Sequence, residues 1–177
     1  MVVRSIADDE AGSPQTLVWG LLYQTFTAVF KETERALAAA GISGPQAFAL
    51  DCLRYGTSPM IPARLAGYMG QESQSLTGLL DRMEAQGWIR RVRDLPDRRS
   101  LRIELTAAGE AKLAVAHQLG RPAMAQAFAD LTPDELLVLG NLLDRVRTSA
   151  LLRLGLDPEE ARVWREPAEG VDTAVAS

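Results

Sequence analysis

Apolar residues recur every three or four positions along most of this chain, which is the spacing of one buried face on an α-helix. The spacing predicts a long first helix over residues 15–40, ended by a left-handed glycine at position 41. Shorter helices are predicted over residues 45–55, 61–69 and 73–86. Leucine and alanine are abundant and aromatic residues are few, so the expected fold class is mainly α.

Residues 88–105 change to the alternating pattern of β-strands. Apolar and polar residues alternate over residues 88–93 and 100–105, and the six residues between them are rich in turn formers. This pattern predicts a β-hairpin. Two short helices separated by a glycine-containing turn precede it, so residues 45–105 are predicted to form a winged helix-turn-helix, which makes the fold α+β in detail.

Helical spacing returns after the hairpin. Thr106 is expected to cap a helix that reaches about residue 130, with a break or kink at Gly120-Arg121-Pro122. The run Thr132-Pro133-Asp134-Glu135 combines an N-cap, a first-turn proline and a capping-box glutamate, and it predicts a last helix that ends near residue 154.

The first and last helices carry more apolar surface than one neighbouring helix can cover. We therefore expect residues 15–44 and 106–154 to form the dimerisation region of a homodimer, within a single domain over residues 15–154. Residues 1–14 lack periodicity and are predicted to be disordered. Residues 155–177 read as an acidic tail that includes one short helix at 158–164.

Charge is distributed unevenly along the chain. The formal net charge of the 177 residues is −4, but residues 88–105 hold six arginines against three carboxylates. The tail over residues 155–177 holds six acidic residues against two arginines, so the tail accounts for the acidic total. The hairpin is therefore the basic surface of the protein.

Several classes of protein are disfavoured by what the sequence lacks. One cysteine excludes an internal disulfide and a cysteine-rich zinc site. The first residues do not resemble a secretory signal and no long uncharged apolar run occurs, so a cytoplasmic protein without membrane contact is expected. The common motifs of hydrolases, nucleotide-binding enzymes and metalloproteases are missing, so we expect no catalytic residues, no metal site and no cofactor.

The polar side of the helix over residues 73–86 is suited to a DNA major groove. Ser73, Gln74, Ser75 and Thr77 lie near its N-terminus, opposite the leucine stripe, and Gln, Ser and Thr side chains hydrogen-bond to base edges. The alternative for the arginine-rich hairpin is a solvated surface with ion pairs. DNA binding is favoured because this hairpin follows a helix-turn-helix pattern, which the alternative does not require.

Short motifs between residues 64 and 109 resemble, in order and spacing, the signature of the MarR-type (multiple antibiotic resistance regulator) winged-helix regulators. The resemblance extends over residues 15–154 and is most specific over residues 61–109. The matching motifs are Arg64-Leu65-Ala66, Leu76-Thr77, Leu80-Asp81-Arg82-Met83-Glu84, Gly87-Trp88-Ile89-Arg90-Arg91, Asp97-Arg98-Arg99 and Leu105-Thr106-Ala107-Ala108-Gly109.

The resemblance implies a homodimer that binds double-stranded DNA, with recognition helices in successive major grooves of a pseudo-palindrome and wing arginines in the flanking minor grooves. Asp97 would then support the wing arginines. Gly78 stands where many relatives carry arginine, which shifts the expected recognition toward DNA shape. The implied DNA contacts are Ser73, Gln74, Ser75, Thr77, Arg82, Arg91, Arg98 and Arg99.

The aromatic series Trp19, Tyr23, Phe26 and Phe30 recurs at helical spacing and has two interpretations. Packing in the core and dimer interface is favoured. The alternative, implied by the resemblance, is the wall of a pocket for a small aromatic or phenolic effector, to which His117 would also belong. Both interpretations are compatible with each other.

The sequence therefore predicts a sequence-specific DNA-binding transcription regulator, a homodimeric repressor that is released from its operator by a small ligand. Two alternatives stay open. One is a winged-helix module that contacts proteins without binding an operator, favoured by the overall acidity and by Gly78. The other is an oxidant sensor that uses Cys52, although no basic residue lies at a helical spacing that would lower the pKa of its thiol.

Overall fold

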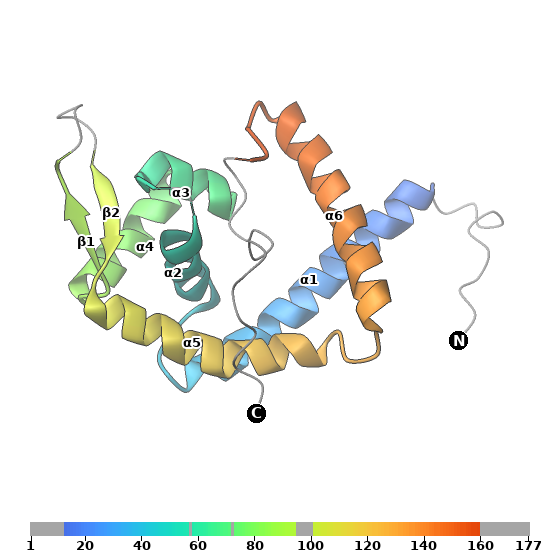
Figure 1. Ribbon diagram of the computed structural model, residues 1–177, viewed down its shortest axis with the longest axis horizontal. Helices are drawn as coiled ribbons and strands as arrows, with labels where there is room; N and C mark the ends of the chain where they lie inside the picture. Colours follow the sequence, from blue (N-terminus) through green and yellow to red (C-terminus); the bar gives the residue numbers. More distant parts are fainter. Residues whose placement is uncertain (1–12, 57, 72, 95–100, 160–177) are drawn as a thin grey trace.

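The computed structural model describes residues 13–56, 58–71, 73–94 and 101–159. Figure 1 shows a helical protein with one small antiparallel sheet, so the expected mainly α fold with a winged helix-turn-helix is confirmed. In order, the elements of the described ranges are α1 (Pro14–Ala38), α2 (Gly44–Tyr55), α3 (Pro62–Met69), α4 (Ser73–Ala85), β1 (Ile89–Val92), β2 (Arg102–Leu105), α5 (Ala107–Gln126) and α6 (Pro133–Arg153).

The hairpin predicted from alternation is present. Strand β1 pairs antiparallel with β2, with Ile89 opposite Leu105 and Val92 opposite Arg102. Ile89 and Ile103 point into the core, while Arg90 lies on an exposed face, as the two-residue period of a strand requires. The turn between the strands lies outside the described residues.

Local capping signals predicted the helix starts correctly. Ser43 and Thr132 each accept a hydrogen bond from the backbone N–H three residues later, and Gln46 and Glu135 return the contact, so both capping boxes are confirmed. Gly41 has a φ of 65°, the left-handed conformation expected for a residue that ends a helix.

The break predicted near Gly120 does not occur. Helix α5 contains Pro122 in its interior and continues to Gln126, short of the predicted residue 130. A proline removes one helical hydrogen bond, yet the helix continues through this position. A Cβ atom on Gly120 would lie 3.4 Å from the Thr33 side chain and 3.7 Å from Leu37, so this part of α5 packs at ordinary contact distance from α1.

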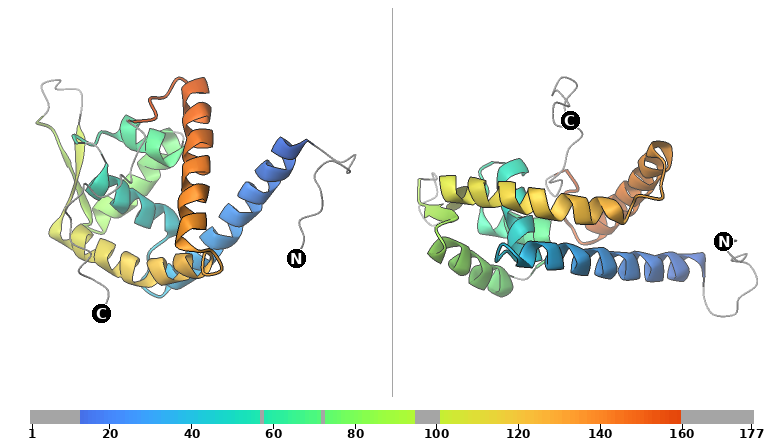
Figure 2. Two further views of the ribbon diagram at one scale, coloured as in Figure 1. Left: turned by 45° about the vertical axis from the view of Figure 1, so that its right-hand side comes forward. Right: turned by 90° about the horizontal axis from the view of Figure 1, so that it is seen from below.

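The core lies in the lobe formed by α2, α3, α4 and the wing, and the adjoining ends of α1 and α5 complete it. Figure 2 shows that α1 and α5 run side by side along one edge of this lobe. Leu37 of α1 and Leu113 of α5 are almost fully buried together with the leucines of the helix-turn-helix. The predicted dimerisation helices are therefore also part of the core of the winged helix-turn-helix lobe.

The N-terminal half of α1 and the whole of α6 project away from this lobe (Figure 1). Helix α6 contains no buried residue, and large apolar side chains on both helices face solvent: 67% of Trp19, 65% of Phe26 and 59% of Leu137 is exposed. Such a large apolar surface is unusual for a lone chain. Within the described ranges, no helix is both long and apolar enough to span a lipid bilayer.

Candidate nucleic-acid interface

Helix α4 has one buried face and one polar face, as its sequence pattern predicted. Leu76, Leu80 and Met83 are among the most buried side chains of the protein and anchor α4 to the lobe. Gln74 and Ser75 are exposed near the N-terminus of the helix. Thr77, Asp81 and Arg82 are exposed on the same side, whereas Ser73 begins α4 but its side chain lies outside the described part.

Gly78 and Arg82 are linked by their spacing on α4. A Cβ atom built on Gly78 would meet one side-chain atom within 4 Å, Nη1 of Arg82 at 3.6 Å. The Arg82 side chain therefore folds back along the helix over the glycine, as side chains four positions apart do. Arg82 forms no ion pair with another described residue, so its charge is available to an external anion.

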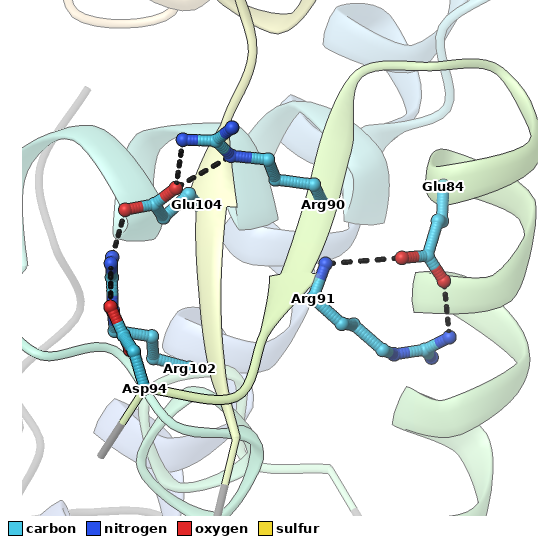
Figure 3. Close-up of polar contacts among 6 residues, drawn as sticks. All are labelled: Glu84, Arg90, Arg91, Asp94, Arg102 and Glu104. Atoms are coloured by element: carbon cyan, nitrogen blue, oxygen red, sulfur yellow. Dashed lines mark hydrogen bonds and ion pairs between the residues drawn. The ribbon is translucent and has the colours of Figure 1, made fainter.

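Arginines at the base of the wing are neutralised by neighbouring carboxylates. Figure 3 shows Arg90 and Arg102 on either side of Glu104, with Arg102 also bound to Asp94. The Arg90 nitrogens lie 2.6 Å from Glu104, and Nη2 of Arg102 lies 2.5 Å from the Asp94 carboxylate. The hydrogen bonds from Arg102 lower the pKa of Asp94.

Arg91 points to the opposite side of the hairpin, toward α4. Its Nη1 donates to Glu84 at 2.6 Å and its Nη2 donates to Asp81 at 2.6 Å (Figure 3 shows the Glu84 contact). Burial lowers the pKa of the Arg91 guanidinium, but the two carboxylates raise it by more, so that the pKa is raised overall. The Arg91 guanidinium, which the sequence predicted to contact DNA, is thus bound to two carboxylates of α4.

The remaining predicted wing residues, Asp97, Arg98 and Arg99, lie outside the described residues. Arg93, which follows β1, is exposed and forms no ion pair with a described residue. Among the described arginines of the hairpin and α4, Arg82 and Arg93 are thus left without a carboxylate partner.

The predicted effector residues do not assemble into one site in the chain. Trp19 and Tyr23 are exposed on α1, and the Phe26 and Phe30 rings stack with centroids 5.5 Å apart. A separate open cavity of about 640 Å³ lies between α1, α2 and α5, and of the predicted residues it includes His117. Its lining residues are Thr33, Leu37, Ala47, Asp51, Tyr55, Ala116, His117, Gly120, Arg121 and Met124.

A polar pair marks one wall of this cavity. His117 of α5 hydrogen-bonds through Nε2 to Oδ1 of Asp51 on α2 at 2.7 Å, and the Tyr55 ring stacks on His117 with centroids 6.1 Å apart. Sequence reasoning missed Asp51, Tyr55 and Arg121. Their signal was the four-residue spacing of polar residues on two helices, which puts Asp51 beside Tyr55 and His117 beside Arg121.

Cys52 follows Asp51 in the sequence, but it does not line the cavity. Its side chain is completely buried. Burial, and to a smaller extent the negative charge of Asp51, raise the pKa of the Cys52 thiol to about 12. The reactive thiolate form is therefore rare at neutral pH.

The sequence profile of the MarR family matches residues 42–101, the segment from just before α2 to just before β2. The chain belongs to the MarR family. The multiple antibiotic resistance protein MarR of Escherichia coli is 33% identical over 86 residues, which are 48% of this chain and 60% of that protein. A crystal structure of a mutant of E. coli MarR complexed with operator DNA is 26% identical, covers 73% of this chain and 93% of the crystallised chain, and has a TM-score of 0.66.

One further curated relative and one further solved structure are similar to this MarR-family chain. The transcriptional activatory protein BadR of Rhodopseudomonas palustris is 37% identical over 115 residues, 62% of this chain and 66% of BadR. The chain thus spans about two thirds or less of the length of MarR and BadR. The structure of CouR from Rhodococcus jostii bound to p-coumaroyl-CoA has the same fold, with 22% identity, a TM-score of 0.67, and coverage of 84% of this chain and 96% of CouR.

Proposed function

We propose that this MarR-family protein is a sequence-specific DNA-binding transcription regulator. The observation that carries the proposal is the exposed polar side of α4, which holds Gln74, Ser75, Thr77 and an arginine without an ion pair to another described residue, Arg82, on a helix-turn-helix followed by a wing. Such a surface enters a major groove without a steric or charge conflict. The DNA complex of E. coli MarR supports this proposal.

We also propose that the protein acts as a homodimer through α1 and α6. The exposed apolar side chains of both helices require a cover, and a two-fold axis would let one copy cover the other. The two copies of α4 would then contact half-sites about one helical turn of DNA, roughly 34 Å, apart. A pseudo-palindromic operator follows from this symmetry.

The effector site of the proposal is the cavity between α1, α2 and α5. It is lined mainly by apolar groups with a small polar cluster around His117, the common composition of a site for a small organic ligand. An aromatic or phenolic compound fits this composition. Because α1 belongs to the dimer surface and α2 to the DNA-binding lobe, a bound ligand would alter the separation of the two recognition helices and release the operator.

The alternatives are less well supported. The buried Cys52 thiol, with its pKa raised to about 12, is poorly suited to sensing oxidants. A module that contacts only proteins would not require an unpaired arginine on the polar face of α4. Whether binding represses or activates depends on the position of the operator relative to the promoter, and we propose repression.

Footprinting on the DNA upstream of the protein's own gene tests the proposal. Protection of two half-sites on one face of the duplex is expected, and log K should fall with log salt by roughly 0.9 per contacted phosphate. Arg99→Ala should weaken binding without changing the fold or the dimer. If no duplex is bound at low salt, the protein-contact alternative gains and the DNA-binding proposal is lost.

The effector proposal is tested separately by titrating simple phenols and aromatic acids into the operator complex. Release of DNA is expected at concentrations that saturate the cavity. His117→Ala should abolish the release but not DNA binding, whereas Gln118→Ala, on the exposed side of α5, should leave both unchanged. Operator affinity that no such compound alters would indicate a constitutive binder.

A further inference from the structure

We propose that Arg91 is a positioning residue that fixes the angle between the wing and the recognition helix, and that it does not bind DNA. The inference rests on the proposed DNA-binding function. It concerns the ion pairs that connect β1 to α4, in which Arg91 of the wing meets Asp81 and Glu84 of the helix.

The contact is bidentate and joins two elements. The Arg91 guanidinium donates to Asp81 and to Glu84 through different terminal nitrogens, each at 2.6 Å. The backbone N–H of Arg91 donates to the other carboxylate oxygen of Glu84 at 3.1 Å. Asp81 and Glu84 lie three positions apart on one side of α4, so the planar guanidinium is held at two points of the helix and at its own backbone.

The charges of this cluster oppose a direct phosphate contact. One guanidinium faces two carboxylates, so the cluster has a net charge of about −1. The Arg91 side chain is 25% exposed, and both terminal nitrogens are already bonded. A phosphate bound to the remaining N–H groups of Arg91 would lie close to both carboxylates, which is electrostatically unfavourable.

The rest of the helix–wing junction consists of backbone bonds at its base and the buried side chains of Ile89 and Ile103. The chain reverses at Gly87, with a φ of 70°, and backbone bonds join Trp88 to Met83 and Gly87 to Glu84. These bonds fix the base of the hairpin. Arg91 lies two residues beyond Ile89, roughly 7 Å further along the strand.

In the described strands, Arg91 is the side chain that forms ion pairs with α4. The turn at Gly87 holds the base of the hairpin and the Arg91 ion pairs hold β1 at a second point, so the two attachments together set the angle between β1 and α4. Without the second point, a small rotation at the base becomes a larger displacement along the hairpin, and the helix and the wing no longer match one DNA surface together.

The chain offers a matched control in Arg90. This arginine is the neighbour of Arg91 in β1 and has the same charge, but it is 68% exposed on the opposite side and pairs with Glu104 across the sheet (Figure 3). Arg90→Ala removes one charge and one ion pair without touching α4. Arg82→Ala is the comparison for loss of a direct DNA contact.

The first experiment measures operator affinity over a range of salt concentrations for these three variants. Arg91→Ala should lose about tenfold in affinity with an unchanged salt slope, because no phosphate contact is lost. Arg82→Ala should reduce the magnitude of the slope by roughly 0.9, and Arg90→Ala should change affinity by less than about twofold. A reduced slope or an unchanged affinity for Arg91→Ala would overturn the proposal.

A double-mutant cycle with Glu84→Gln tests whether Arg91 acts through the helix. If it does, Arg91→Ala should cost much less in the Glu84→Gln background than in the wild type, because the attachment is already weakened. Equal costs in both backgrounds would show that Arg91 acts independently of Glu84, and the proposal would be wrong.

Amide hydrogen exchange of the free protein tests the same idea without DNA. Arg91→Ala should accelerate exchange in β1 and β2 severalfold and leave α4 and α5 protected, whereas Arg90→Ala should not. Unchanged hairpin exchange would overturn the positioning role. If the wild type binds no duplex while the exchange result holds, the DNA-binding proposal fails and the helix–wing attachment stands.

Discussion

Gly109 lies at the closest approach between α5 and the wing, and replacing it with alanine is the most informative test of this packing. A Cβ atom built at this position would lie 2.0 Å from the carbonyl oxygen of Trp88 and 3.0 Å from a methyl group of Leu105. The same Trp88 carbonyl accepts a hydrogen bond from the Thr106 N–H at 3.0 Å. The added methyl group therefore collides with backbone that is already hydrogen-bonded.

The magnitude follows from the distance. Ordinary contact begins near 3.4 Å, so α5 and the wing must separate by roughly 1.4 Å at this point. Overpacking of this kind costs about 1–3 kcal/mol, and weakening the hydrogen bond to Trp88 costs about 1 kcal/mol more. The higher helix propensity of alanine offsets at most about 1 kcal/mol of this destabilisation. The net expected loss in the free energy of unfolding is about 1–3 kcal/mol.

Urea unfolding followed by circular dichroism at 222 nm measures this loss, at one fixed protein concentration because a dimer unfolds in a concentration-dependent way. Gly67→Ala is the matched control. Gly67 is also helical, in α3, but a Cβ atom there has no neighbour within 4 Å, so the same substitution should stabilise by about 0.5–1 kcal/mol. A Gly109→Ala protein as stable as Gly67→Ala would refute the close packing of α5 on the wing.

Three further predictions concern α6, the thiol and the apolar surface. Thr132→Ala should destabilise α6 by about 1 kcal/mol in thermal unfolding. The contacts with Thr132 lower the pKa of the Glu135 carboxyl. The stability that capping contributes should therefore be present above the ordinary carboxyl pKa and be lost as the pH falls through the lowered pKa of Glu135. Cys52 should resist alkylation by iodoacetamide at pH 8 until the protein is unfolded in urea, as measured by mass spectrometry; rapid labelling of the native protein would contradict its burial and its raised pKa. Leu137→Glu should convert the proposed dimer to monomers in light scattering, and a dimer that persists in this variant would place the interface elsewhere.

The candidate site divides into a part that the sequence predicted and a part that it did not. The polar face of α4 was predictable because residues three and four positions apart share a helix face, and burial of Leu76 and Leu80 leaves Gln74 and Ser75 outside. The partners of Arg91 were not predictable, because its orientation toward α4 depends on how the hairpin folds back after Gly87. Sequence alone therefore gave its charge a DNA-binding role.

The sequence by itself determined the elements of this protein and most of their ends. Capping boxes such as Ser43 with Gln46 act over three residues, and the period of apolar residues is a property of one helix or strand, so neither needs the fold. Tertiary structure alone decided what depends on distant segments. His117 and Asp51 are 66 positions apart, and their hydrogen bond forms because α5 packs beside α2. A contact between such distant residues is set by packing between elements, which no local pattern specifies.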